Sequence, residues 1–157
     1  MDIKKALFDA LITKFSDNVS DDAETLTDLL FAAGKASQAL LLSVLFMPEF
    51  KIIGDSVVLA RSLEYESAES NFVGALAKGE MSREKVETSF NFVEIGYLFD
   101  TSGSDTTDEE DELLAELVRD AWDGWLRASF PNRRFTVEVV PPEVTGSTVG
   151  VHFYENR

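Results

Sequence analysis

The sequence predicts an α+β fold: a single globular domain, residues 1–157, with about five or six helices packed on a small antiparallel sheet. Apolar residues recur at helical spacing along much of the chain. Two segments, about 49–60 and 134–154, instead contain short apolar runs around turn residues, as β-hairpins do. No repeat or long linker divides the 157 residues, a length that suits one domain with its own core.

Three helices are predicted before the first hairpin. Residues 2–16 carry an apolar stripe at helical spacing, with charged side chains outside it. Ser20 or Asp21 is the expected N-cap of the second helix, because Glu24 follows Asp21 at the spacing of a capping box. The segment 36–46 is apolar nearly all round, which predicts a central, buried helix.

The first hairpin is predicted from its turn. Segments 50–53 and 56–60 flank Gly54 and Asp55, and glycine at the first central position suits a type II′ turn, which requires a positive φ there. Neither segment alternates cleanly between apolar and polar residues. Both faces of this hairpin are therefore expected to be partly covered.

Two helices are expected after this hairpin. Residues 62–78 place apolar side chains on one helical side, and Gly79 is the expected C-terminal stop. Residues 82–99 are ambiguous, because 93–99 alternates like a strand while a polar stripe runs through the segment at helical spacing. The adjacent apolar pair Phe92 and Val93 breaks the strand alternation, which favours a helix, capped by Ser82, throughout 82–99.

The clearest helix signal begins at Thr107. Glu110 completes a capping box with Thr107, and acids in the first turn match the helix dipole. The apolar stripe that follows includes Trp122 and Trp125, which are expected to pack in the core. The helix is expected to end at 130–132.

The C-terminal segment is predicted to be the second hairpin. Apolar and polar residues alternate along 135–140 and again along 149–154, with Pro141, Pro142 and Gly146 in the longer loop between them. The two hairpins are expected to join into one antiparallel sheet with helices over one face.

The residue types exclude several kinds of catalytic or metal site. The chain has no cysteine, which excludes disulfides, thiolate metal sites and cysteine catalysis. His152 is the only histidine, so it cannot form a histidine metal cluster, and its alternating position predicts an outward-facing strand residue. No phosphate-binding glycine motif or nucleophile elbow is present, and 100–105 fails the EF-hand pattern. We expect no enzyme activity, no cofactor and no metal.

The charge narrows the classes of partner. The formal net charge is −15, from 29 acidic and 14 basic residues, and a field of this sign repels nucleic acids and anionic membranes. It favours a basic protein partner and speeds the encounter with it. Asp9 interrupts any apolar signal-peptide region, and the apolar run 39–47 is too short to span a bilayer. A cytoplasmic location is therefore expected.

Two groups of acids are the candidate interaction surface. The first is a run without any basic residue, and the second forms a polar stripe at helical spacing. The alternative interpretation of both is solvation and helix capping. The residues are Asp100, Asp105, Asp108, Glu109, Glu110, Asp111 and Glu112 in the run, and Glu84, Glu87 and Glu94 in the stripe.

Three functions are compatible with these features. The first is a non-catalytic acidic protein that binds another protein, in its most concrete form an immunity or antitoxin-like protein that masks a basic partner such as a nuclease. The second is a structural or adaptor domain that self-associates as a homo-oligomer, which an exposed apolar helix or an open sheet edge would support. The third is a small-ligand binder or enzyme that uses carboxylates only, which would need a deep pocket around a buried carboxylate.

Overall fold

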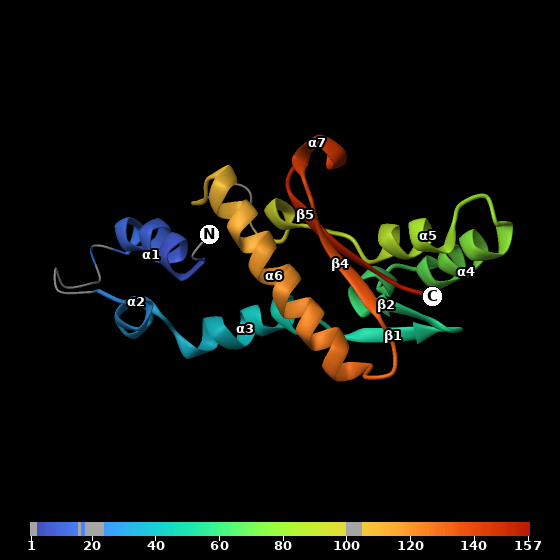
Figure 1. The fold of residues 1–157 in the computed structure, drawn as a ribbon, viewed down its shortest axis with the longest axis horizontal. Coiled ribbons are helices and arrows are strands. Elements are labelled where there is room, and N and C mark those ends of the chain that lie inside the picture. Colours follow the sequence, from blue (N-terminus) through green and yellow to red (C-terminus); the bar gives the residue numbers. More distant parts are fainter. Residues whose placement is uncertain (1–2, 16, 18–23, 100–104) are drawn as a thin grey trace. The chain divides into compact units, whose positions relative to one another are not determined.

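The fold is α+β, as predicted (Figure 1). The computed structural model describes residues 3–15, 17, 24–99 and 105–157. The chain divides into two compact units, 1–43 and 44–157, and the single domain stays a prediction. Within the described residues, no helix combines the length and apolar character needed to cross a membrane.

The first unit is helical. It contains α1 (Ile3–Lys14), α2 (Leu26–Ala33) and most of α3 (Ala36–Phe46). The expected N-cap of α2 is wrong, because the helix begins after Thr25. The Thr25 hydroxyl accepts from the Asp28 N–H at 3.2 Å, and the Asp28 carboxylate accepts from the Thr25 N–H at 2.9 Å. Ser20 and Asp21 lie outside the described residues.

The helix α3 has the predicted bounds but not the predicted burial. Leu45 is its only buried residue, whereas Leu40 and Leu41 are 74% and 71% exposed. A helix that is apolar all round is buried only where other elements cover it. The composition of the helix alone does not specify that cover.

The second unit begins with the predicted hairpin, made of β1 (Phe50–Ile53) and β2 (Ser56–Leu59). The strands pair antiparallel with Ile53 opposite Ser56. Gly54 has a φ of 64°, while Asp55 keeps a negative φ, as a type II′ turn requires. Strand β2 is buried throughout and β1 is not, which confirms the expected partial cover of the hairpin.

The helix expected at 62–78 begins later than predicted. Strand β2 leads directly into the 3₁₀ turn η2 (Ala60–Leu63), and α4 (Ala68–Lys78) starts only after Ser67, which adopts a left-handed φ of 69°. This φ interrupts a right-handed helix between the two segments. Gly79 ends α4 with a φ of 65°, as predicted.

The single helix expected at 82–99 is wrong. Ser82 caps α5 (Arg83–Phe90) as predicted, but the chain then forms β3 (Val93–Glu94) and the 3₁₀ turn η3 (Ile95–Tyr97). Asn91 causes the break: its side-chain amide accepts from the Leu59 N–H at 2.9 Å and donates to the Val57 carbonyl at 3.1 Å. The residues that follow then pair with a strand far along the sequence.

The second sheet has three strands in the order β3-β5-β4. The long helix α6 (Asp108–Ser129) has the predicted Thr107–Glu110 capping box and is followed by β4 (Phe135–Val140), the short helix α7 (Pro142–Thr145) and β5 (Gly150–Glu155). The two hairpins do not join into one sheet, because β3 takes the side of β5 that β4 leaves open.

The main core of the second unit lies between α6 and the three-stranded sheet. Trp122, Leu126, Val151 and Phe153 are among its fully buried members. The Trp122 indole N–H donates to the Leu45 carbonyl at 2.7 Å, which ties α6 to the end of α3. Trp125, expected in the core, is 37% exposed and lies outside the core cluster, although its indole N–H donates to the Pro48 carbonyl at 3.1 Å. A smaller cluster of Val58, Phe72 and Val86 joins β2, α4 and α5.

Candidate functional site

Three features of the second unit have the polar or charged side chains that a functional site needs. They are an arginine–carboxylate network around the buried Glu87, a groove beside β4, and the acidic start of α6.

The network is centred on the carboxylate of Glu87. Its side chain is 2% exposed, although an ionised carboxylate is seldom buried without partners. Oε1 accepts from the Ser56 hydroxyl at 2.8 Å and from Arg83 Nε at 3.2 Å. Oε2 accepts from the Glu155 N–H at 3.0 Å. The carboxylate is therefore satisfied from β2, α5 and β5 together.

Two further arginines complete the network. Arg133 forms a bidentate pair with Glu155, with N–O distances of 2.5 and 2.8 Å. Arg157 reaches Asp55 and Glu155, each at 2.6 Å. Hydrogen bonds from Arg133 hold the pKa of Glu155 below its ordinary value, and Arg83 and Arg157 lower the pKa of Asp55 in the same way.

The network is built for cohesion. Three arginines face three carboxylates, so its charges balance: Arg83, Arg133 and Arg157 with Asp55, Glu87 and Glu155. These residues come from the β1–β2 turn, from α5, from the segment just before β4 and from the end of β5 and the residues after it. An ion network of this kind cross-links the elements that contribute its side chains.

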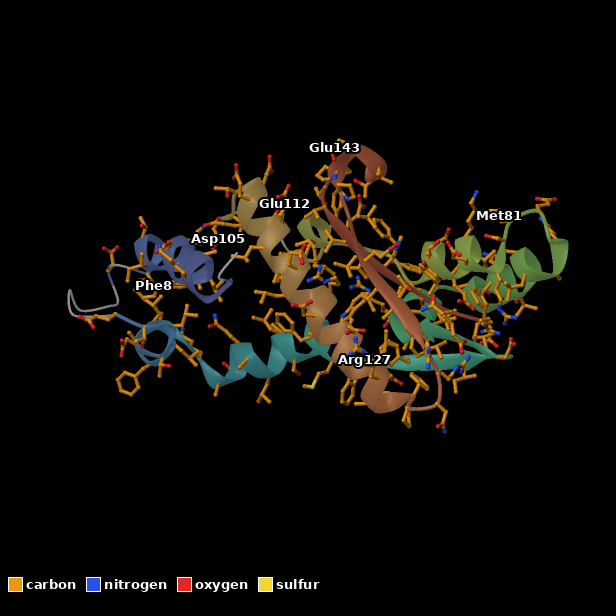
Figure 2. The ribbon with its side chains drawn as sticks, viewed as in Figure 1. Phe8, Met81, Asp105, Glu112, Arg127 and Glu143 are labelled. Atoms are coloured by element: carbon orange, nitrogen blue, oxygen red, sulfur yellow. The ribbon has the colours of Figure 1, made fainter. Side chains whose placement is uncertain are left out.

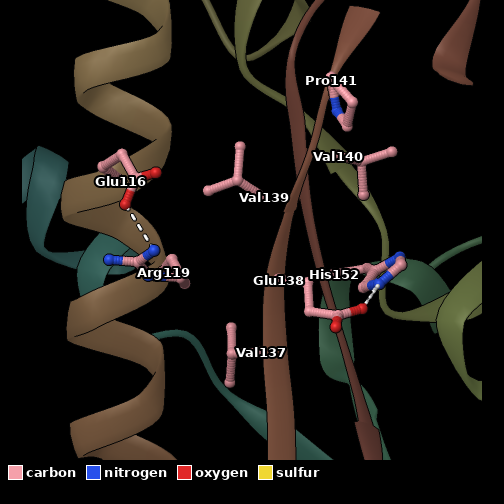
Figure 3. A pocket seen from close by; sticks show the side chains of 8 residues that line it. All are labelled: Glu116, Arg119, Val137, Glu138, Val139, Val140, Pro141 and His152. Atoms are coloured by element: carbon pink, nitrogen blue, oxygen red, sulfur yellow. Dashed lines mark hydrogen bonds and ion pairs between the residues drawn. The ribbon is translucent and has the colours of Figure 1, made fainter. Parts of the chain in front are cut away.

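A groove of about 540 Å³ lies between α6 and β4 (Figure 3). Glu116 and Arg119 line it from α6, and they form an ion pair at 2.6 Å. Val137 and Val139 of β4 point toward α6 and are half-buried against the core. The groove is therefore apolar at its base and charged along its helical side.

The groove extends round the edge of β4 to its other face. Glu138 and His152 are cross-strand partners there, and their side chains lie 3.2 Å apart. The His152 side chain is 20% exposed, so it is more covered than an outward-facing strand residue was expected to be. Among the described residues, no three His, Asp or Glu side chains are placed to hold a metal ion.

The predicted acidic surface is only partly assembled. Asp105, Asp108, Glu109 and Glu112 are exposed around the start of α6, where Figure 2 shows Asp105 and Glu112 near that helix end. Glu110 and Asp111 are half-buried, and Glu110 serves the capping box. Asp100 lies outside the described residues.

The predicted acidic stripe does not form one face. Glu84 is exposed on α5, Glu94 is half-buried on β3, and Glu87 is the buried centre of the network. In Figure 1, α5 lies away from the start of α6, across the sheet. Glu84 and the α6 acids therefore do not make a continuous surface, and Glu87 as an exposed interaction residue is a wrong expectation.

Sequence reasoning missed both the network and the groove. Arg83 precedes Glu87 by four residues, the spacing of a helical ion pair, and this was the only local signal of the network. The groove depends on which strand lies at the edge of the sheet.

Comparisons with protein-family models, with characterised proteins and with solved structures find no match to this chain.

Proposed function

We propose that this chain is a non-catalytic protein that binds a basic partner protein through the acidic side of its second unit. The observation that supports this proposal most is the distribution of charge. Five of the seven arginines of the second unit are used in ion pairs within it: Arg83, Arg119, Arg127, Arg133 and Arg157.

A dense part of the negative charge that remains lies at one end of α6, and other exposed acids lie around α4. The segment 105–112 contains acids and no Lys or Arg, and Asp108, Glu109 and Glu112 are exposed. Figure 2 places Glu143 of α7 at the same end of the sheet as Glu112. A concentrated field of one sign accelerates association with an oppositely charged protein and disfavours acidic competitors.

The masking of a basic toxin is the most specific form of this proposal. A masking protein must bind tightly, so the contact needs an anchor besides charge, because exposed charges are screened by salt. The groove beside β4 lies next to the acids of α6 and offers half-buried valines as that anchor.

The test is affinity capture from a lysate of the source organism with a charge-neutralised control. The wild-type chain is compared with the triple variant Asp108→Asn/Glu109→Gln/Glu112→Gln, which leaves the Thr107–Glu110 capping box intact. One stoichiometric basic protein should be captured at low salt, and the variant should lose most of it. The amount of partner captured by the wild-type chain should also fall as the salt concentration rises.

A second triple variant provides the matched control. Glu64→Gln/Glu66→Gln/Glu69→Gln changes the net charge equally but at exposed residues before and within α4. Capture should survive this change. Equal loss with both triple variants, or a captured partner that is not basic, would contradict the proposal.

Self-association is a second candidate, because apolar side chains are exposed on α2 and α3. Leu30, Phe31 and Leu40 are 68%, 93% and 74% exposed, and such residues are typical of contacts with another protein. Sedimentation velocity over a range of concentrations tests it. A monomer throughout would contradict self-association and would leave the first proposal standing.

A further inference from the structure

The outer side of β4 is an open sheet edge. Strand β4 pairs with β5 on one side, and no other described strand pairs with it on the other. An unpaired edge presents backbone N–H and C=O groups that another chain can bind as an added strand. Whether this edge can do so depends on which residues point outward and what surrounds them.

The register identifies those residues. The Asn156 N–H donates to the Arg134 carbonyl, so hydrogen-bonded pairs alternate along the ladder from that point. The backbone N–H and C=O groups of Thr136 and Glu138 in β4 therefore point toward β5. The N–H and C=O groups of Val137 and Val139 point outward, away from β5. Consistently, the N–H of Glu155, opposite Phe135, donates to Glu87 and not to β4.

The groove makes this edge accessible to an extended segment. It runs between the β4 edge and α6, and its lining includes 137–141 of the edge itself. Figure 3 shows Val137 and Val139 on the side of α6 and Glu138 with His152 on the other. A strand added here would therefore place alternate side chains on an apolar floor and on a polar, acidic face.

The charges around the groove select the kind of segment. Glu116 and Glu138 line it, and Arg119 is already paired with Glu116 at 2.6 Å and Asp120 at 2.7 Å. Glu112 is exposed one turn before Glu116 on α6. Lysine and arginine are thus favoured beside this edge, and acidic segments are repelled.

We propose that the outer edge of β4, with the groove between it and α6, binds an extended segment of a partner protein in which apolar and basic residues alternate. The segment adds to the sheet as a strand next to β4. Its apolar side chains pack on Val137 and Val139, and its basic side chains lie near Glu138. This inference rests on the proposed function for the basic partner and adds the place and mode of binding.

The decisive measurement is backbone amide hydrogen exchange by NMR, with and without a synthetic probe. The probe is a capped hexapeptide in which lysine and valine alternate. At saturation, exchange of the Val137 and Val139 amides should slow at least tenfold, because each outward N–H gains a partner. The Thr136 and Glu138 amides, already bonded to β5, should be unchanged.

Two control peptides test the sequence requirements of the probe. One has the same composition with the three lysines before the three valines, and the other has glutamate in place of lysine. Neither should slow exchange at Val137 and Val139. Slowing by the glutamate peptide equal to that by the lysine peptide would overturn the proposal, as would binding of the lysine peptide with no change at these two amides.

A variant gives an independent measurement of affinity. Val137→Pro removes an outward N–H, and proline is tolerated on the outer side of an edge strand. The dissociation constant for the lysine–valine peptide should rise about tenfold. Glu138→Gln should weaken binding less, and Glu84→Gln on α5 should not change it. If Val137→Pro fails to fold, the exchange measurement on the wild-type chain decides alone.

The result separates this inference from the proposed function. If Val137→Pro captures the basic partner from lysate as well as the wild type does, the groove is not the site and the proposed function stands. If the wild type captures no basic partner, the proposed function fails. The hydrogen-exchange result alone then tests whether the β4 edge binds the lysine–valine peptide. A third outcome would also overturn the proposal. If the Val137 and Val139 amides are already protected in the free chain and sedimentation shows a dimer, a second copy of the chain occupies the edge.

Discussion

Removal of the buried carboxylate of Glu87 should be among the most destabilising single changes in the second unit. Its side chain is 2% exposed and its two oxygens accept from Ser56, Arg83 and the backbone of Glu155. Glu87→Ala would strand these donors in a buried site. Truncating one partner of a buried, hydrogen-bonded ion pair costs about 3–5 kcal/mol, and because the Arg83 side chain is 36% exposed the cost here should lie near the lower end of that range.

Glu87→Gln is the more discriminating change, because it keeps the volume of the side chain. One oxygen remains as an acceptor, but the amide NH₂ must replace the other and would then face a donor. If it faces the Glu155 N–H, one buried hydrogen bond is lost and two donors oppose each other. The expected cost is about 2 kcal/mol, within the range for a buried polar group left unsatisfied.

Urea unfolding followed by tryptophan fluorescence measures both effects, since Trp122 and Trp125 both belong to the second unit. With a slope of about 2 kcal/mol per M, the glutamine variant should lower the midpoint by about 1 M and the alanine variant by more. Glu84→Gln on the same helix is the control, because Glu84 is exposed and should change stability by less than about 0.5 kcal/mol. A Glu87→Gln midpoint equal to that of wild type would refute the reasoning.

Two other predictions concern the same unit. Gly150→Ala should lower the thermal unfolding midpoint, because a Cβ there would lie 2.2 Å from Cε2 of Phe92 and 2.9 Å from the Val93 carbonyl oxygen. Over-packing of this kind typically costs about 1–3 kcal/mol. An unchanged midpoint would contradict this prediction. Arg133 lowers the pKa of Glu155, so its carboxylate stabilises the native state above the ordinary pKa of 4.5 and this contribution is lost as pH falls through the folded-state pKa. The free energies of unfolding of wild type and Glu155→Gln should therefore differ most near neutral pH and converge in acid. Urea unfolding measured from pH 7 down to about pH 3 tests this. A difference in free energy that stays constant over this range would argue against the prediction.

Local signals in the sequence predicted local structure well. The Thr107–Glu110 capping box, the Gly54 turn and the Gly79 stop are all present. Each depends on backbone geometry and hydrogen bonds among residues a few positions apart. The α+β class followed from the same kind of signal, because periodicity distinguishes long amphipathic helices from short alternating strands.

The segment 82–99 shows where local signals compete. It carries both helical and strand spacing, and the sequence favoured a helix throughout. The structure ends the helix at Phe90, because Asn91 bonds the backbone of β2 and Val93 pairs with Val151 of β5. Both partners are distant in sequence, so no window around this segment could have revealed them.

The candidate site divides in the same way. Exposure of Asp108, Glu109 and Glu112 follows from the amphipathic pattern of α6 and was predictable. The burial of Glu87 was not, because its partners Ser56 and Glu155 come from β2 and β5. A carboxylate on a polar helical stripe looks solvated until other elements supply its donors.

By itself, the sequence determined the fold class, the strong negative charge, the caps and turns, and the exclusion of cysteine and histidine-cluster chemistry. These properties depend on residue types and on spacing within a few positions. Only the tertiary structure decided that the hairpins form separate sheets, that Glu87 is buried in an arginine network and that β4 is an open edge beside a groove. Those outcomes depend on which distant segments compete for the same hydrogen-bonding groups and the same apolar surface, and that competition is resolved only when the whole chain packs.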